Sequence, residues 1–308
     1  GMDIRIEDLS KHYGPQAAVD GIGFTVNTGE VLGFLGPNGA GKTTTMKMIC
    51  GLVAPDQGTI RVGGHSVAEE PQIVRRHIGY LPENNPLYED MPVLDHLRFS
   101  AKVQGVPEGR IQERIAEMVR VCGLDAEKHK RVGELSKGYR QRVGLAQAMV
   151  HDPEVLILDE PTTGLDPNQI VEIRELIKEV GRAKTVIFST HILPEVEATC
   201  DRIMIISKGR IVAHGSPSDL RRQAQGRVVL NVRVEEVDAS LVRSALSGLP
   251  GVDLVETIAQ GGFSLQCAPD MPVARSVSAL CAERHWPLTE LHSPGTRLED
   301  IFRDLTLN

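Results

Sequence analysis

The chain has 308 residues, 41% hydrophobic and 24% charged, which suits a globular protein of one large or two smaller domains. Its net charge of −7 gives no global electrostatic support for nucleic-acid or anionic-membrane binding, and its five cysteines lack the C-x-x-C spacing of a zinc site. The cysteines are odd in number and widely spaced, so disulfides are not expected and a reducing cytoplasm is the expected compartment. No apolar run approaches the roughly 18 residues of a membrane span, and the first residues lack a secretory pattern.

The N-terminal part is expected to be rich in strands. Ile4–Leu9 and Ile22–Val26 alternate apolar and polar residues, as half-buried antiparallel strands do. Val31–Leu35 is a nearly continuous apolar run, typical of a strand buried on both faces, and a helical stretch follows at Thr43–Leu52. Two further short strands are expected at Thr59–Val62 and Ile78–Leu81.

The middle of the chain changes to a helical period, from Pro92 to about Val150. Beyond it, the apolar runs Val155–Leu158 and Thr185–Ser189 are separated by the amphipathic stretch Ile170–Val180. A hairpin is expected from Ile203–Ser207 and Arg210–His214. Strands that alternate with helices predict an α/β protein with a doubly wound sheet, here with a helical insertion near residues 86–150.

The polar run Arg221–Gly226 predicts a linker, which gives expected domains at residues 2–222 and 227–308. The second domain has the element order βαββαβ of a ferredoxin-like α+β unit. Its expected elements are strands Val228–Val234, Val252–Thr257, Phe263–Cys267 and Leu288–Leu291, and helices Ser240–Ser247, Val273–Arg284 and Leu298–Leu305. Its aromatic residues Phe263, Trp286 and Phe302 are most simply core, and a regulatory or dimer-contacting module is the alternative interpretation.

A glycine-rich segment between the expected strand Val31–Leu35 and the helix after it fits G-x-x-x-x-G-K-[ST]. Glycines let the backbone curl so that several N–H groups point at one place, the helix adds its positive end, and Lys42 adds a full charge. The segment therefore predicts a cradle for a nucleoside triphosphate, a feature that kinases, GTPases and transport ATPases share. Its residues are Gly36, Pro37, Asn38, Gly39, Ala40, Gly41, Lys42, Thr43 and Thr44.

Two carboxylates, Asp159 and Glu160, end the apolar strand that begins at Val155. An acid at the carboxyl end of a sheet strand, beside such a glycine-rich loop, lies where Mg²⁺ needs a ligand or a water anchor. Asp159 suits that role, with Thr43 supplying a hydroxyl. Glu160 is then placed to polarise the water that attacks the γ-phosphorus. The alternative is a pair of surface acids.

Leu135–Gln141 opens a further helix, in which Ser136 can cap the first turn and Gly138 leaves that turn open to an anion. With this segment, residues 2–222 resemble the nucleotide-binding subunit of ATP-binding-cassette (ABC) transporters. The resemblance makes Gly36–Thr44 the Walker A loop, Val155–Glu160 the Walker B strand, and Leu135–Gln141 the LSGGQ motif. The other matched positions are Tyr13 (adenine stacking), Glu83 (Q-loop), Asp166 (D-loop) and His191 (switch histidine).

The resemblance implies a P-loop ATPase core with an antiparallel β subdomain, and two copies that close head to tail on ATP and Mg²⁺. ATP on one P-loop would meet Ser136 and Gly138 of the other copy, and Thr43, Glu83 and Asp159 would hold the metal. It also implies an integral-membrane permease as partner, no nucleic acid, and a position at the inner face of the cell membrane. The implied catalytic residues are Glu160, His191, Glu83 and Asp166.

Two sites depart from the family pattern. Glu83 stands in place of a glutamine, and a carboxylate can bind Mg²⁺ but cannot donate a hydrogen bond unless it is protonated. Lys137 and Tyr139 replace a glycine and the glutamine of LSGGQ, and Lys137 either adds a cation near the phosphate or faces solvent. Both departures resemble the sequences of the family branch that serves drug, antibiotic and gliding-motility exporters. Residues 82–88 and 298–305 resemble the gliding-motility group of that branch.

Two other functions compete with transport. ABC proteins of DNA repair or translation usually carry two cassettes, long coiled-coil insertions or C-x-x-C zinc modules, and the sequence contains none of these. A nucleotide sensor without turnover would lack a catalytic carboxylate or histidine, whereas Glu160 and His191 are present. The prediction is therefore an ATP-binding and ATP-hydrolysing subunit of an ABC exporter.

Overall fold

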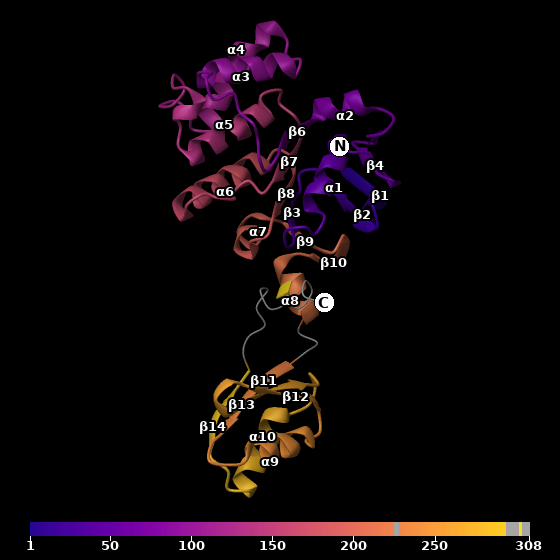
Figure 1. Ribbon diagram of the computed structural model, residues 1–308, viewed down its shortest axis with the longest axis vertical. Coiled ribbons are helices and arrows are strands. Elements are labelled where there is room, and N and C mark those ends of the chain that lie inside the picture. Colours follow the sequence, from indigo (N-terminus) through magenta and orange to yellow (C-terminus); the bar gives the residue numbers. More distant parts are fainter. Residues whose placement is uncertain (225–227, 294–301, 304–308) are drawn as a thin grey trace. The chain divides into compact units, whose positions relative to one another are not determined.

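The computed structural model describes residues 1–224, 228–293 and 302–303 (Figure 1). The described chain divides into two compact units at Pro217–Ser218, inside helix α8 (Pro217–Ala224). The linker prediction is therefore wrong at residues 221–224. Arginine, glutamine and alanine are good helix formers, and here they follow a proline at the helix start and an acidic Asp219 in the first turn.

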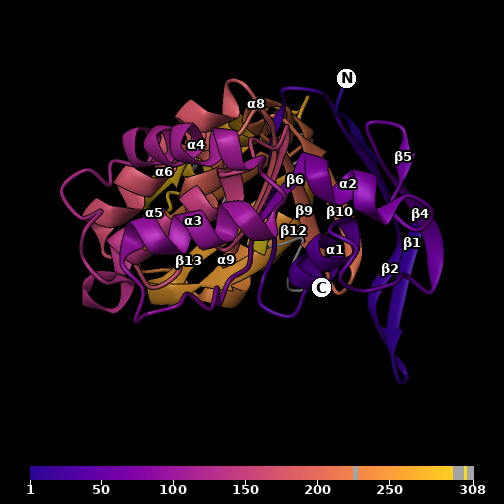
Figure 2. The ribbon, with the colours of Figure 1, turned by 90° about the horizontal axis from the view of Figure 1, so that it is seen from above.

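A six-stranded sheet, ordered β10-β9-β3-β8-β7-β6, forms the centre of the first unit. Neighbours from β9 to β6 are parallel, and β10 is an antiparallel edge. Figures 1 and 2 show α1 on one side of this sheet and α5 and α6 on the other. Burial on both faces explains the continuous apolar runs, so the doubly wound prediction is confirmed. The strands are β3 (Val31–Leu35), β6 (Ile78–Leu81), β7 (Val155–Asp159), β8 (Thr185–Thr190), β9 (Arg202–Ser207) and β10 (Arg210–Gly215).

The helices around this sheet include two that the sequence did not predict. The expected helices are present as α1 (Lys42–Ile49) and α6 (Pro167–Gly181). Two seven-residue helices, α2 (Pro71–His77) and α7 (Leu193–Thr199), were missed because so short a segment carries too few turns to display a period. Both place a proline in the first turn, which favours a helix start.

An antiparallel sheet, ordered β2-β1-β4-β5, covers the amino-terminal part of the same unit. The first two strands continue well beyond their expected ends, because bulges shift the register and break the apolar alternation while pairing continues to Tyr13 opposite Gln16. One hydrophobic core joins the two sheets, with Phe24 of β2 and Phe34 of β3 at 5.9 Å between ring centroids. The strands are β1 (Ile4–Tyr13), β2 (Gln16–Val26), β4 (Gln57–Val62) and β5 (His65–Ser66).

The expected helical insertion consists of α3 (Val93–Val103), α4 (Glu108–Val121), a 3₁₀ turn η1 (Val132–Glu134) and α5 (Lys137–Met149). The apolar stripe on α4 is buried, which is the pattern that predicted the helix. Helix α5 contacts α3 and α4 as well as β6 and α6. It therefore connects the insertion mechanically to the central sheet.

The second unit has the predicted βαββαβ order, and its antiparallel sheet runs β12-β13-β11-β14, the ferredoxin-like arrangement. Phe263 is buried in its core and Trp286 packs partly buried against it. Most of the expected helix Leu298–Leu305 lies outside the described residues. The elements are β11 (Val228–Val234), α9 (Ala239–Ser247), β12 (Val252–Ile258), η2 (Ala259–Gly261), β13 (Gly262–Cys267), α10 (Val273–Glu283) and β14 (Leu288–His292).

Candidate active site

The glycine-rich loop lies between β3 and α1, against the backbone of two other strands. A side chain at Gly36 would place Cβ 2.5 Å from the Ile206 carbonyl oxygen, and one at Gly41 would place it 2.5 Å from that of Ala18. Gly41 also has φ +106°, a conformation that glycine adopts without strain. The N-terminus of α1 has no side-chain cap, so its N–H groups are available to an anion.

Lys42, the first residue of α1, is buried with its ammonium group inside the loop. Nζ donates a hydrogen bond to the Gly36 carbonyl oxygen and lies 2.8 Å from Oε1 of Glu160. The cation thus bridges the loop and the end of β7. A triphosphate bound in the loop would compete with Glu160 for this charge.

The fully buried carboxylate of Asp159 is held by two hydroxyl groups. Thr43 Oγ1 donates to Oδ2 at 2.8 Å, and Ser189 Oγ donates to Oδ1 at 2.6 Å. Ser189 Oγ also accepts a hydrogen bond from the Glu160 backbone N–H at 3.0 Å. Thr43 and Asp159 therefore meet as the sequence predicted. Ser189, to which no role was assigned, fixes both consecutive acids.

Glu160 is buried and adopts φ +48°, a strained conformation for a residue other than glycine. Its carboxylate accepts from Lys42, from Thr163 Oγ1 at 3.1 Å, and contacts His191 Nδ1 at 3.1 Å. Burial raises the pKa of Glu160, but the Lys42 hydrogen bond and the charges of Lys42 and His191 outweigh it, so the net pKa is lowered. The group is therefore an ionised acceptor at neutral pH.

Glu83 follows β6 and joins the electrostatics of this site. Partial burial, followed by the charges of Asp159 and Glu160, raises the pKa of Glu83, while Lys42 and His191 lower it less. Three carboxylates thus share one edge of the sheet. Like charges repel across this edge, which is why the two neighbouring carboxylates contribute to the raised pKa of Glu83.

Glu83→Gln is expected to raise the melting temperature of the nucleotide-free protein at pH 7–8. The folded state raises the pKa of Glu83 above its ordinary value of 4.5, so ionisation opposes folding as pH rises through that window. The side chain is exposed, so the gain should be at most about 2 °C, and it should disappear near pH 4. Thermal melts of both proteins from pH 4 to pH 8 measure it. A difference that grows toward acid pH would contradict this interpretation.

The helix start at Ser136 lies beside the segment that follows Glu160. Ser136 caps α5 by accepting from the Tyr139 N–H at 3.3 Å, while Gly138 is buried against the Gln169 side chain. Gln141 Nε2 donates to the Pro161 carbonyl oxygen at 2.6 Å, a tether that the sequence did not assign. Among the described residues, no recorded hydrogen bond joins Ser136 or the Gly138 backbone to the glycine-rich loop of its own chain.

The remaining predicted positions have visible local roles. Asp166 caps α6 in a capping box with Gln169, and Lys137 lies against Gly164 at the same turn. Tyr13 is 54% exposed at the end of β1, with Lys11 Nζ 5.6 Å from its ring centroid. An exposed aromatic ring at the end of the β1–β2 hairpin is available for stacking.

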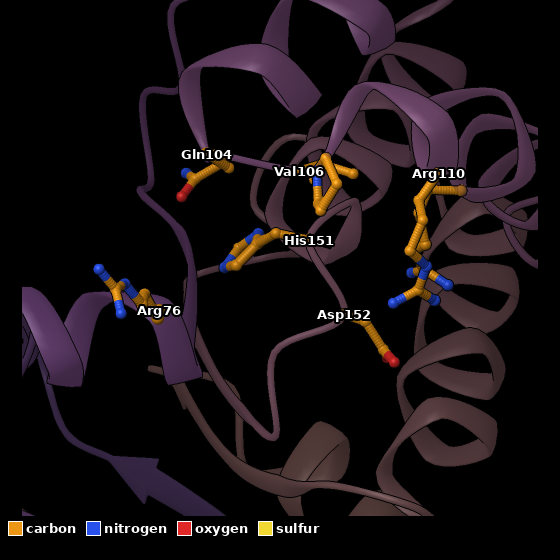
Figure 3. Close-up of a pocket in the computed structure, with 9 residues that line it drawn as sticks. Arg76, Gln104, Val106, Arg110, His151 and Asp152 are labelled. Atoms are coloured by element: carbon orange, nitrogen blue, oxygen red, sulfur yellow. The ribbon is translucent and has the colours of Figure 1, made fainter.

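A separate pocket of about 340 Å³ (Figure 3) lies at the amino ends of β6 and β7. Arg76 precedes β6, and His151 and Asp152 precede β7, so these residues mark the amino ends of strands whose carboxyl ends carry the acids. His151 Nε2 donates to the Ile78 carbonyl oxygen at 2.9 Å, and burial lowers the pKa of this histidine. The pocket is cationic because its lining includes Arg76, Arg110 and Arg114.

Known proteins match this arrangement. A family model described as "ABC transporter" matches residues 19–163, and one described as "AAA domain, putative AbiEii toxin, Type IV TA system" matches residues 131–196. The chain is 36% identical to the ABC transporter ATP-binding protein YxlF of Bacillus subtilis, covering 97% of this chain and 98% of the relative. It is 33% identical to the linearmycin resistance ATP-binding protein LnrL of the same organism, covering 98% of each.

The chain is also 36% identical to the Nod factor export ATP-binding protein I of Paraburkholderia xenovorans, covering 98% of this chain and 96% of the relative. A solved ATP-binding subunit of an ABC transporter superposes with a TM-score of 0.65 at 35% identity, covering 73% of this chain and 93% of that one. The alternative of DNA repair or translation is not favoured by these relatives. The chain belongs to the ATP-binding subunits of ABC transporters, a family that binds and hydrolyses ATP.

Proposed function

We propose that the chain powers an exporter by closing on ATP as a homodimer and coupling that closure to a separate integral-membrane permease. The observation that carries the proposal is that Lys42 and His191 both contact the carboxylate of Glu160. This contact lies beside the glycine-rich loop, where α1 begins. Relatives named for linearmycin resistance and Nod factor export support the direction of transport. The place of action is then the inner face of the cell membrane.

Magnesium fits the donor set at this edge. Thr43 Oγ1 and Asp159 Oδ2 lie 2.8 Å apart, and Glu83 adds a carboxylate whose ionisation a nearby cation would favour. Hard oxygen donors of this kind suit Mg²⁺, which would supply positive charge to neutralise the phosphates. These three side chains are proposed to hold the ion.

The protein's own groups would act in sequence. ATP would occupy the loop and draw Lys42 from Glu160 to the β- and γ-phosphates, which frees the Glu160 carboxylate. Glu160 would then orient the attacking water and accept its proton, and His191 would contact the γ-phosphate and the same water. Asp166 of the second copy would help to position this water. Tyr13 would stack on the adenine ring.

Each active site is proposed to be completed by Ser136 and Gly138 of the second copy. The start of α5 presents about half a positive charge, so closure would depend on the γ-phosphate and would be released by hydrolysis. The ABC domain would correspond to the first compact unit, which ends at Pro217, and the C-terminal accessory domain to the second. Among the described residues, no helix meets the length and apolarity required of a membrane span.

Mixing two inactive variants tests this arrangement. A dimer of one Lys42→Ala chain and one Ser136→Arg chain contains one site with both defects and one intact site, whereas each homodimer contains two damaged sites. Mixing the variants is therefore expected to restore measurable ATPase activity, up to half of the wild-type rate per mixed dimer. Activity in either variant alone equal to that in the mixture would contradict completion by the second copy.

A further inference from the structure

Glu195 is a buried carboxylate with no role in the proposed chemistry. It lies in the first turn of α7, just after His191, and is only 3% exposed. Its Oε2 accepts hydrogen bonds from Thr162 Oγ1 at 2.6 Å and from Thr190 Oγ1 at 3.0 Å. Among the described residues, no cation pairs with it, and Oε1 has no hydrogen-bond partner.

A further contact is consistent with Thr190 as the donor to Glu195. Thr190 Oγ1 accepts from the Ile192 backbone N–H at 2.9 Å, so its own proton is free to point at Glu195. Both threonines are buried, and an unpaired buried hydroxyl is unfavourable. Glu195 therefore serves as the shared acceptor for two hydroxyl groups from separate segments.

The two threonines adjoin the two residues of the proposed hydrolytic pair. Thr162 follows Glu160 by one intervening proline, and Thr190 directly precedes His191. Because the Glu160 carboxylate contacts His191 Nδ1 at 3.1 Å, the contacts close a ring through Glu195. The ring joins three segments: the turn after β7, the end of β8 with the residue that follows it, and α7.

We propose that Glu195 is a positioning residue that holds Glu160 and His191 at their working separation through Thr162 and Thr190. This inference rests on the proposed function of Glu160 and His191. Glu195 does not touch the loop that receives the phosphates, so it should affect the chemical step and spare nucleotide binding. Geometry of this kind matters, because a displacement of about 1 Å can lower a rate by about 10²-fold.

The test compares Glu195→Ala with Glu195→Gln in the full chain. The amide oxygen of glutamine still accepts both hydroxyl hydrogen bonds, so Glu195→Gln should retain at least about half of the wild-type kcat. Alanine leaves both hydroxyls without their acceptor, so Glu195→Ala should lose about 10- to 100-fold in kcat, with the Kd for ATP within about threefold. Glu175→Ala, which removes an exposed glutamate of α6, is the matched control and should leave kcat unchanged.

Coupling between the residues provides a second measurement. Thr162→Val and Thr190→Val remove one hydroxyl each and should lower kcat singly. In the Glu195→Ala background neither should lower it further, because residues acting as a unit are not additive. These milder variants keep the proposal testable if Glu195→Ala fails to fold. Full additivity of the losses would overturn it, as would a kcat within twofold of wild type in folded, ATP-binding Glu195→Ala.

A readout without turnover separates this inference from the proposed function. The ring nitrogen signals of His191 in the nucleotide-free protein, followed by ¹⁵N NMR, should shift in Glu195→Ala and remain unchanged in Glu195→Gln and Glu175→Ala. If the wild type failed to hydrolyse ATP, the proposed function would fall while this structural coupling was still measured. Unchanged His191 signals in Glu195→Ala would overturn the positioning role.

Discussion

Replacing Glu160 by glutamine is expected to preserve ATP binding, reduce turnover by about 10²- to 10⁴-fold and accumulate an ATP-bound dimer. Glutamine has nearly the same shape, and its amide oxygen can still accept from Lys42. It cannot accept the proton of the attacking water at neutral pH. ATP would therefore remain intact between the two copies, and the dimer would stay closed because the γ-phosphate is not removed.

Size-exclusion chromatography with Mg-ATP, beside a steady-state ATPase assay, measures this outcome. The Glu160→Gln protein should elute as a dimer with ATP and as a monomer with ADP, whereas wild type should return to monomer as it hydrolyses ATP. Glu175→Gln removes an equal charge from an exposed position of α6 and should behave as wild type. Monomers alone, together with undiminished turnover, would refute the role of Glu160.

The part of the site that sequence predicted is the part made by neighbouring residues. The glycine-rich loop and the acids at the end of β7 each lie within one short segment, and a buried strand followed by a helix announces them. Thr43 and Asp159 were paired in advance because a parallel sheet brings the carboxyl ends of its strands to one edge. The ferredoxin-like order was also predictable, since each element carries its own period.

The rest depended on contacts between distant segments. Ser189, Gln141 and Glu195 each make a hydrogen bond with a residue 20 to 33 positions away, and no local sequence pattern predicts such partners. The missed part of β1 and β2 is similar, because bulged pairing replaces apolar alternation there. At α8 the cause is different: the polarity of residues 221–226 indicates a linker, whereas the arginine and glutamine in it favour a helix.

Replacing Lys42 by alanine is expected to weaken ATP binding and also to destabilise the empty protein. The first effect follows from loss of a cation at the β- and γ-phosphates. Hydrogen bonds to charged groups contribute about 1.5–3 kcal/mol, so the Kd for ATP should rise about 10- to 100-fold. The second effect follows from Glu160, which would keep its burial and lose the ammonium group at 2.8 Å.

The pH dependence identifies the cause of that destabilisation. In the wild type the net pKa of Glu160 is lowered below 4.5, despite burial, so its charge stabilises the fold above that pH and the benefit is lost as pH falls through the folded pKa. Without Lys42, only His191 opposes the effect of burial on Glu160, so the pKa of Glu160 rises. Breaking a buried pair costs about 3–5 kcal/mol, and the loss should be larger at pH 7–8 than at pH 4.

The double variant Lys42→Ala/Glu160→Gln separates the two effects. Its neutral amide needs no cation, so it should recover most of the melting temperature that Lys42→Ala loses at pH 7, while its Kd for ATP should stay as weak as that of Lys42→Ala. Thermal melts between pH 4 and pH 8 and equilibrium titration with ATP measure both quantities. An unchanged Kd in Lys42→Ala would count against phosphate binding by Lys42. If the loss of stability in Lys42→Ala did not depend on pH, the buried charge of Glu160 could not be its cause. The ion pair with Lys42 would then not be what keeps Glu160 ionised in the nucleotide-free protein.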